Sequence, residues 1–299
     1  MIDPVIFSFT IGGITIALRW YGVLVMTGVM IAAWLSANEI KRHGENPDYI
    51  WDALVWIVLA GMVGARLWYV VNATLGGSRY YLDNPMRALN ITEGGLHFYG
   101  ALLFGAVAMI LYARKYKLDL WLFLDALAPN ILIGQAIARP ANFINQELYG
   151  QPTTLPWGIP IDAVHRIAPY DNLLTYPVEF TKFHPTFAYE MLWNFFAAFA
   201  LLLIARNYEE KIRPGVVFYG WLALSGLGRI FIEFFRPDQP RIPGTDISYT
   251  MAVAALMLLA GLALLLDKLE VIRIPFLPKG SDEYHVAPIG EVETAVRGA

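Results

Sequence analysis

Seven long apolar runs constrain the fold of this 299-residue chain more than any other feature of its sequence. They lie near residues 16–37, 51–73, 95–113, 119–138, 186–206, 215–235 and 248–266. Each run can cross the ~30 Å hydrocarbon core of a bilayer, because an α-helix rises about 1.5 Å per residue. Hydrophobic residues make up 57% of the chain and charged residues 16%, which is more apolar side chain than a soluble core can bury. The sequence therefore predicts an all-α polytopic membrane protein with seven transmembrane helices.

The rest of the composition excludes several functional classes. A net charge of −3 argues against a nucleic-acid partner, which would select a basic face. The absence of cysteine excludes disulfides, cysteine nucleophiles and cysteine-ligated metals within the chain. The five histidines show no paired ligand spacing, so we predict no metal site. The first apolar stretch lacks a basic start and is broken by Gly12 and Gly13, so we do not expect a cleaved signal peptide.

Lysine and arginine are concentrated in the short loops after the first, third and fifth runs. Such loops face the cytoplasm, so the N-terminus is predicted to lie outside and the C-terminus inside. The basic residues are Lys41, Arg42, Arg114, Lys115, Lys117, Arg206, Lys211 and Arg213, and the tail adds Lys268, Arg273 and Lys279. We predict one membrane domain over residues 1–274 and a polar, disordered cytoplasmic tail over residues 275–299.

The longest loop, residues 139–185, joins the fourth and fifth runs. It contains seven prolines but also many aromatic residues, which a free linker would not need. Loops of this length inside a compact domain are usually functional. We expect a small ordered cap on the outer face of the helix bundle, which in a bacterial cell is the periplasmic side.

With this topology, the unusual polar residues of the runs converge on the outer leaflet. They are Tyr21, Arg66, His97, Tyr99, Arg139, His184, Glu190, Arg229, Glu233 and Arg236. An arginine near mid-membrane costs about 2.5–3.5 kcal/mol on insertion scales, so such residues tend to be paired or functional. Guanidinium groups suit phosphate oxygens, and a phosphate at this depth belongs most simply to a phospholipid headgroup. The residues alone thus predict an outer-leaflet phospholipid site.

Simpler structural roles are open for the same residues. Arg229 and Glu233 are four residues apart on a helix and could simply neutralise each other. Arg66 lies beside Gly61 and Gly64, so it could bond to carbonyls at a close helix contact. These roles explain the residues singly, but they do not explain three arginines and several acids at one depth.

Residues 138–150, ARPANFINQELYG, concentrate hydrogen-bonding side chains where the fourth run ends. Asn142 and Asn145 could satisfy backbone groups where the helix breaks at Pro140. Bound to a phospholipid, the same asparagines and nearby tyrosines would hold glycerol hydroxyls. Glu147 or Glu190 would then orient the arginines.

This segment resembles the signature of the prolipoprotein diacylglyceryl transferase family, Gly-Arg-x-Gly/Ala-Asn-Phe-x-Asn-x-Glu-x-x-Gly. The matching residues are Arg139, Ala141, Asn142, Phe143, Asn145, Glu147 and Gly150. Further stretches follow in the family's order: RWYG (19–22), GAR (64–66), GGLHFYG (94–100), LDALAP (124–129), HPTFAYE (184–190) and IEFFRPD (232–238). The resemblance covers most of the chain from residue 19 to residue 238.

The resemblance implies a multi-pass enzyme of the bacterial inner membrane with seven spans. Such enzymes move the diacylglyceryl group of phosphatidylglycerol to the lipobox cysteine thiol of a prolipoprotein. The product is a thioether, glycerol 1-phosphate is released, and no metal or organic cofactor is needed. The implied active site faces the outer leaflet, in agreement with the topology predicted from the basic loops.

The resemblance also suggests roles for single residues. Arg139 and Arg229 would neutralise the departing phosphate ester, with Tyr99 positioning the lipid or thiol. The expected substrate-binding residues are Tyr21, Arg66, Arg139, Asn142, Asn145, Glu147, Gly150, His184, Glu190 and Glu233. The chain departs from the family at Tyr99, where many members have a histidine that is often cast as the base. His97 lies two positions earlier, and two residues apart on a helix point to different sides, so we do not expect it to substitute.

Two other functions compete with the transferase. A lipid transporter or scramblase would also place charges inside the bundle, but on both leaflets along a path and with repeat symmetry. The one-sided distribution of charge argues against it. A phospholipid-binding protein without chemistry would keep the arginines and need no base, and only an activity measurement separates it from the enzyme.

Overall fold

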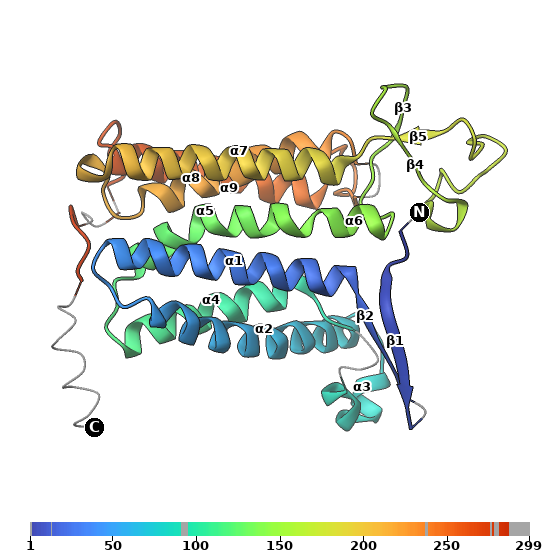
Figure 1. Cartoon of the computed structure of the whole chain (residues 1–299), viewed down its shortest axis with the longest axis horizontal. Helices are drawn as coiled ribbons and strands as arrows, with labels where there is room; N and C mark the ends of the chain where they lie inside the picture. The colour runs from blue at the N-terminus through green and yellow to red at the C-terminus, as the bar shows by residue number, and fades with distance from the viewer. Residues whose placement is uncertain are drawn as a thin grey trace. The chain divides into compact units, whose positions relative to one another are not determined.

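The computed structural model describes residues 2–12, 14–90, 95–236, 239–275, 277 and 281–286 (Figure 1). Contacts between residues divide the chain into two compact units. The first unit comprises residues 1–35 and 124–283, and the second comprises residues 36–123 and 284–299. Each unit is described by itself.

The chain is a mostly helical, polytopic membrane protein. Six helical segments are long and apolar enough to cross a bilayer: Trp20–Arg42 (α1), Asp48–Leu75 (α2), Leu120–Ile144 (α5 and α6), Thr186–Asn207 (α7), Val216–Glu233 (α8) and Tyr249–Lys268 (α9). The predicted third run forms the helix α4, Phe98–Lys115. Helix formation is therefore confirmed at all seven runs, whereas a seventh crossing and the N-out/C-in topology stay predictions.

The all-α prediction is wrong at the N-terminus. Strands β1, Val5–Ile11, and β2, Ile14–Arg19, form an antiparallel hairpin, so residues 16–19 belong to a strand and α1 begins at Trp20. Residues 5–11 and 14–19 are rich in β-branched and aromatic residues, which favour strands. Gly12 has φ of +58°, a backbone conformation that two-residue hairpin turns require. The Gly12–Gly13 break in the apolar run was thus a hairpin signal.

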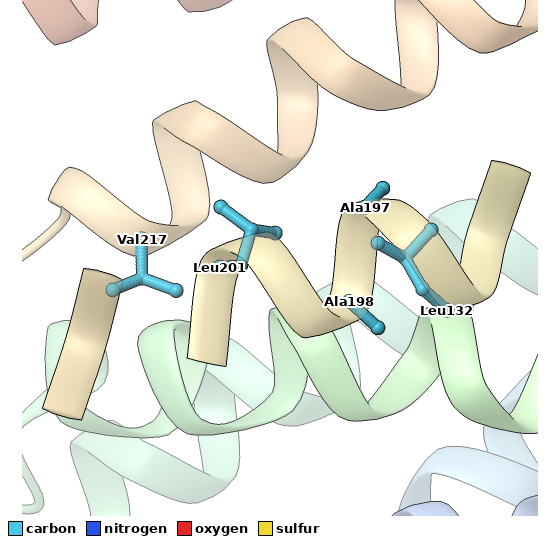
Figure 2. Close-up of a cluster of buried hydrophobic side chains, with 5 residues drawn as sticks. All are labelled: Leu132, Ala197, Ala198, Leu201 and Val217. Carbon is cyan, nitrogen blue, oxygen red and sulfur yellow. The ribbon is translucent and has the colours of Figure 1, made fainter. Parts of the chain in front are cut away.

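In the first unit, α5, α7 and α8 meet at a buried apolar cluster (Figure 2). Leu132 of α5, Ala197, Ala198 and Leu201 of α7, and Val217 of α8 form it. Small residues let the neighbouring helices approach closely, since a Cβ added to Gly226 would lie 2.5 Å from the carbonyl oxygen of Ala254 on α9. In a bilayer, such close packing replaces the hydrophobic driving force that acts in water.

A buried carboxylate joins α5 to the start of α8. Asp125 accepts hydrogen bonds from the backbone nitrogens of Gly215, at 2.6 Å, and Phe218, at 2.7 Å. These nitrogens have no acceptor within the helix, so a carboxylate at this end is favourable. This contact explains why the apolar LDALAP stretch contains an acid.

The predicted cap between α6 and α7 is ordered and has a core of its own. Strands β3, Pro152–Thr153, β5, Lys182–Phe183, and β4, Ile159–Pro160, pair in the order β3-β5-β4, and the short helix η2, Ala163–His165, follows β4. The core residues are Tyr149, Ile161, Tyr170 and Phe183. Gln146 joins the cap to the ARPANFINQELYG segment, because its side chain donates to Asp162 Oδ2 at 2.6 Å and accepts from the Asp162 nitrogen at 2.7 Å.

In the second unit, α2 packs against α4, and the short helices α3, Tyr80–Asp83, and η1, Pro85–Leu89, follow α2. A Cβ on Gly64 would lie 2.4 Å from the Gly100 carbonyl oxygen, so the two helices touch there. Of the predicted tail, His285 belongs to this unit, and its nitrogen donates to Asp119 Oδ2 at 2.7 Å. Residues 287–299, also predicted to be disordered, lie outside the described residues.

Candidate active site

The ARPANFINQELYG segment begins in the junction between α5, Leu120–Ala138, and α6, Pro140–Ile144. Pro140 occupies the first position of α6, where its missing N–H costs nothing. Helical geometry places Asn142 one turn after Arg139, and Arg139 Nη1 donates to Asn142 Oδ1 at 3.3 Å. The segment therefore continues as a helical turn and does not unwind at the proline.

Glu147 binds both asparagines of the segment. It accepts hydrogen bonds through Oε1 from Asn142 Nδ2 at 2.9 Å and from Asn145 Nδ2 at 3.2 Å. The flanking residues Gln146 and Leu148 have φ of +52° and +54°, and this sharp turn brings Glu147 back over α6. Within the described ranges, the side-chain hydrogen bonds of Asn142 and Asn145 thus go to other side chains and not to backbone groups.

Gly150 occupies a position with no room for a side chain. Its nitrogen donates to the His184 carbonyl oxygen at 2.8 Å, and an added Cβ would lie 2.6 Å from the Phe235 carbonyl oxygen. The glycine therefore lets the segment pass between the chain before α7 and the chain after α8. Its contribution to the site is packing.

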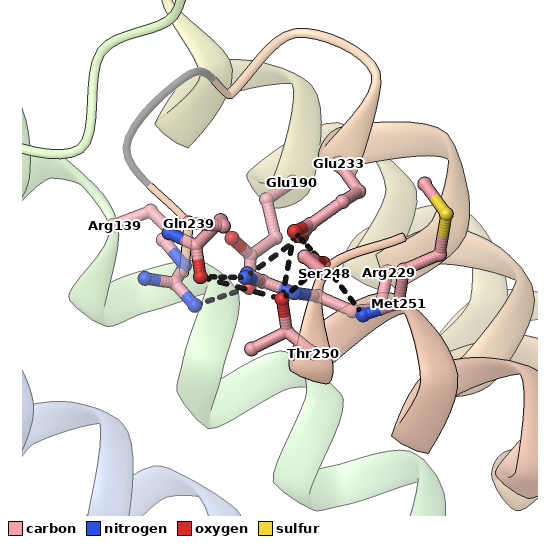
Figure 3. A network of polar contacts seen from close by, with 8 residues as sticks. All are labelled: Arg139, Glu190, Arg229, Glu233, Gln239, Ser248, Thr250 and Met251. Carbon is pink, nitrogen blue, oxygen red and sulfur yellow. Dashed lines mark hydrogen bonds and ion pairs between the residues drawn. The ribbon is translucent and has the colours of Figure 1, made fainter. Parts of the chain in front are cut away.

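Arg139 forms an ion pair with Glu190, on the second turn of α7 (Figure 3). The contact joins Nη2 to Glu190 Oε1, and both side chains are half-buried. Nε of Arg139 is buried and has no hydrogen-bond partner in the described part of the chain. Of the two acids considered for orienting the arginines, Glu190 contacts Arg139 and Glu147 contacts the asparagines.

The second arginine, Arg229, pairs with Glu233 one turn later on α8, with Nη2 3.1 Å from Oε2. This is the pairing that the four-residue helical spacing left open as a simpler role for both residues. Glu233 is buried, and its Oε1 accepts hydrogen bonds from Thr250 Oγ1, at 2.7 Å, and from Ser248 Oγ. Arg229 Nη2 also donates to Gln239 Oε1 at 3.2 Å. Figure 3 shows both arginine pairs within one network of polar side chains.

Sequence reasoning missed Gln239, Ser248 and Thr250. Ser248 caps α9, because its Oγ accepts from the Met251 nitrogen at 2.9 Å. A serine directly before the last apolar run is an ordinary N-cap signal, and it could have marked this helix start. The sequence carries no comparable signal that its hydroxyl also reaches Glu233.

His184 lies just before α7 and is linked to the cap. Trp157 Nε1 donates to the Tyr189 hydroxyl at 2.8 Å, and that oxygen lies 3.0 Å from His184 Nδ1. Burial lowers the pKa of His184 below its ordinary value, so the ring is neutral at pH 7. Since the tryptophan N–H already donates to the Tyr189 oxygen, the tyrosine proton can go to Nδ1, which leaves the histidine proton on Nε2.

Tyr21 and Arg66 stand apart from these bonds. Tyr21 is exposed on the first turn of α1, and no recorded bond joins it to Arg139 or Arg229 among the described residues. Arg66, in the second unit, donates to three backbone carbonyls, those of Ala88 at 2.8 Å, Arg87 at 2.7 Å and Gly95 at 3.1 Å. Among the described residues, Arg66 is thus bonded to carbonyls, but to those of η1 and of the chain before α4, and not to carbonyls at the helix contact beside Gly61 and Gly64.

His97 was not expected to substitute for the family histidine because it was taken to lie on the same helix as Tyr99, and this premise is wrong. His97 precedes α4 as its N-cap, with extended backbone angles of φ −114° and ψ +125°, so the helical spacing to Tyr99 does not apply. The two rings stack, with centroids 5.5 Å apart and an interplanar angle of 29°. Nδ1 of His97 is buried and without a hydrogen-bond partner among the described residues. The histidine and the exposed Tyr99 therefore lie side by side in the second unit.

Comparison with known proteins identifies the family. The sequence model of prolipoprotein diacylglyceryl transferase matches residues 4–266. Among similar proteins, the phosphatidylglycerol–prolipoprotein diacylglyceryl transferase of Chloroflexus aggregans is 37% identical over 244 residues, 79% of this chain and 78% of that protein. The protein of the same name from a Nostoc species is 37% identical over 273 residues, 87% of this chain and 92% of its own. Prolipoprotein diacylglyceryl transfer, the first step of lipoprotein maturation, is therefore the activity of this chain, which belongs to the prolipoprotein diacylglyceryl transferase family.

Proposed function

We propose that Arg139 and Arg229 bind the headgroup phosphate of phosphatidylglycerol while its diacylglyceryl group passes to the lipobox cysteine of a prolipoprotein. The names of the relatives supply the two substrates. The main support for this proposal is that each arginine pairs with one carboxylate through Nη2, Arg139 with Glu190 and Arg229 with Glu233. Arg229, held through Nη2, keeps Nε and Nη1 for an anion, and Arg139, whose Nη1 also donates to Asn142, keeps Nε and the second proton of Nη1.

The reaction makes one bond and breaks one bond. The cysteine sulfur attacks the glycerol carbon that carries the phosphate ester, and a carbon–sulfur bond forms. The carbon–oxygen bond breaks, its electron pair stays on the phosphate oxygen, and glycerol 1-phosphate leaves, while the thiol proton is released. The thiol has an ordinary pKa of about 8.5, so a positive field raises its thiolate fraction at neutral pH. The same field stabilises the charge on the leaving group.

The other predicted residues divide into those that bind and those that support. Asn142 and Asn145, held by Glu147, are placed to bind glycerol hydroxyls, and Tyr21 and Tyr99 position the lipid or the thiol. Glu190 and Glu233 orient the arginines. Gly150, His184 and Arg66 act through packing and backbone contacts.

We further propose that the enzyme lies in the bacterial inner membrane with its N-terminus outside, its C-terminus inside and its active site at the outer leaflet. Basic residues in the last turns of α1, α4, α7 and α9 support this orientation, because such residues favour the cytoplasmic side. In the first unit, Glu190, the partner of Arg139, lies near the start of α7, at the opposite end of this helix from Arg206. The proposed reaction requires no metal or organic cofactor.

The test supplies purified protein in detergent with phosphatidylglycerol and a synthetic lipobox peptide. We expect thioether-linked diacylglyceryl peptide and glycerol 1-phosphate in equal amounts. Diacylglycerol, which lacks the phosphate, should give no product. Peptide lipidation without glycerol 1-phosphate release, or with diacylglycerol as donor, would overturn the proposal.

A further inference from the structure

The network around Glu233 contains hydroxyl groups that no step of the proposed reaction uses. Ser248 and Thr250 come from the start of α9, and both reach the same carboxylate oxygen, Oε1 of Glu233. The Glu233 side chain is 3% exposed, whereas that of Arg229 is 27% exposed. The carboxylate is therefore sealed inside the protein, and the arginine forms the accessible end of the network.

Counting protons shows where each hydroxyl donates. Ser248 Oγ accepts from the Met251 nitrogen, and it gives its single proton to Glu233. Thr250 Oγ1 lies 2.7 Å from Glu233 Oε1, 3.0 Å from Ser248 Oγ and 3.3 Å from Gln239 Oε1, so its single proton goes to the nearest acceptor, which is also the charged one. Oε1 of Glu233 thus receives two hydroxyl donors.

This arrangement determines which atoms remain for Arg229. With Oε1 satisfied by α9, Oε2 of Glu233 faces Arg229 Nη2 at 3.1 Å. Gln239, which keeps its Oε1 as an acceptor, takes a bond from the same nitrogen at 3.2 Å. Among the described residues, the hydrogen bond and the ion pair of Arg229 both involve Nη2. Nε and Nη1 are therefore left for a ligand.

We propose that Thr250, assisted by Ser248, is a positioning residue that fixes Glu233 so that Arg229 presents Nε and Nη1 to the phosphate. The proposal rests on the phosphate-binding role proposed for Arg229. Without the Thr250 hydroxyl, Glu233 Oε1 keeps only the Ser248 donor, and Arg229, already paired with Oε2 of the same carboxylate, can supply the second. The guanidinium would then turn toward the carboxylate with two nitrogens and lose donors for the substrate.

Thr250 is a cleaner test than Ser248, because Ser248 also caps a helix. The variants are Thr250→Val, which removes the hydroxyl at nearly constant volume, and Thr250→Ser, which keeps it. If the protein does not fold with valine at this position, Thr250→Ala removes the hydroxyl instead and is compared with Thr250→Ser in the same way. Thr27→Val is the matched control, since among the described residues the Thr27 hydroxyl bonds only to the Val23 carbonyl oxygen of its own helix.

The measurement is inhibition of the transferase by glycerol 1-phosphate, a soluble probe of phosphate affinity, with the KM for the lipobox peptide determined in parallel. We expect Thr250→Val to raise the inhibition constant about 10-fold or more, as for loss of a hydrogen bond to a charged group. Thr250→Ser should lie within about threefold of the wild type, and the peptide KM should be unchanged. If the role of Thr250 were purely structural, Thr250→Val would instead change both the inhibition constant of glycerol 1-phosphate and the KM for the peptide, and it would lower the thermal unfolding temperature.

Arg229→Gln separates the two proposals. If it raises the inhibition constant while Thr250→Val and Thr250→Ala do not, the positioning role is overturned and the role of Arg229 stands. If Arg229→Gln leaves the constant unchanged, the phosphate-binding role of Arg229 fails, and the positioning role fails with it. Loss of activity in Thr27→Val to the same extent as in Thr250→Val would also overturn the positioning role.

Discussion

Arg66 in the second unit and Arg139 in the first look alike in the sequence, but the structure binds them in different ways. Arg66 donates through Nε, Nη1 and Nη2 to three backbone carbonyls. Arg139 is held by a carboxylate at Nη2 and by an amide oxygen at Nη1, and its Nε has no partner among the described residues. An intramembrane arginine can therefore support a loop or bind a ligand, and its partners distinguish the two roles.

The largest expected effect in this comparison concerns Glu190, the carboxylate that orients Arg139. We predict that Glu190→Ala lowers kcat/KM for lipobox peptide about 100-fold, because a partly buried guanidinium loses the partner that fixes it. Glu190→Gln, which keeps an oxygen acceptor but removes the charge, should give a smaller loss. The steady-state transfer assay measures both variants. Equal activity of Glu190→Ala and the wild type would show that the pair does not orient Arg139.

Arg66 should show the opposite behaviour. Arg66→Met removes the donor of three part-buried hydrogen bonds to backbone carbonyls, so we expect the free energy of unfolding to fall by about 1–3 kcal/mol. The folded fraction should keep its KM for phosphatidylglycerol. Chemical unfolding in detergent and the transfer assay test the two parts separately. A large rise in this KM at unchanged stability would place Arg66 with the phosphate ligands instead.

A smaller effect is expected at His184, whose pKa is lowered by burial. The unfolded chain then binds more protons than the folded chain between the folded pKa and the ordinary value of 6.5. The contribution of His184 to stability is therefore fully present above pH 6.5 and is lost as the pH falls through the folded pKa. His184→Gln should flatten this part of the pH dependence of unfolding. An unchanged pH profile in the variant would contradict the assignment.

The smallest effect is expected at Tyr99, whose ring stacks on His97. Tyr99→Phe keeps the ring, and with it the stacking on His97, and removes only the hydroxyl. We predict a transfer rate within about threefold of the wild type. A fall of about 100-fold would instead make the hydroxyl a direct participant in proton transfer.

Much of the fold could be predicted because bilayer thickness and helix rise fix the length of an apolar run. Helices formed at all seven runs, and the aromatic loop contains a small sheet with a core of its own, while its place on the outer face stays a prediction. The hairpin was missed because its apolar residues continue into α1, so hydropathy alone does not separate strand from helix. The turn glycines were the better signal there.

At the site, the sequence indicated contacts between residues close together on one helix, but it did not indicate contacts between residues far apart in the chain. The spacing of four positions along one helix indicated that Arg229 and Glu233 could form a pair. The partner of Arg139 lies 51 residues away, across the cap, and no single-sequence pattern fixes such a contact. His97 was misjudged because the exact start of α4 decides where its ring points, and helix boundaries are the least predictable part of a sequence reading.

The central claim is that Arg139 acts on the phosphate of the lipid donor, whereas Arg66 does not. The most direct measurement is single-turnover lipidation of a lipobox peptide at saturating phosphatidylglycerol, by Arg139→Gln and Arg66→Gln, each normalised to folded protein. We predict a rate about 100-fold or more below the wild type for Arg139→Gln, and a rate within about threefold of it for Arg66→Gln. Equal rates in the two variants, or a larger loss at Arg66, would contradict the account.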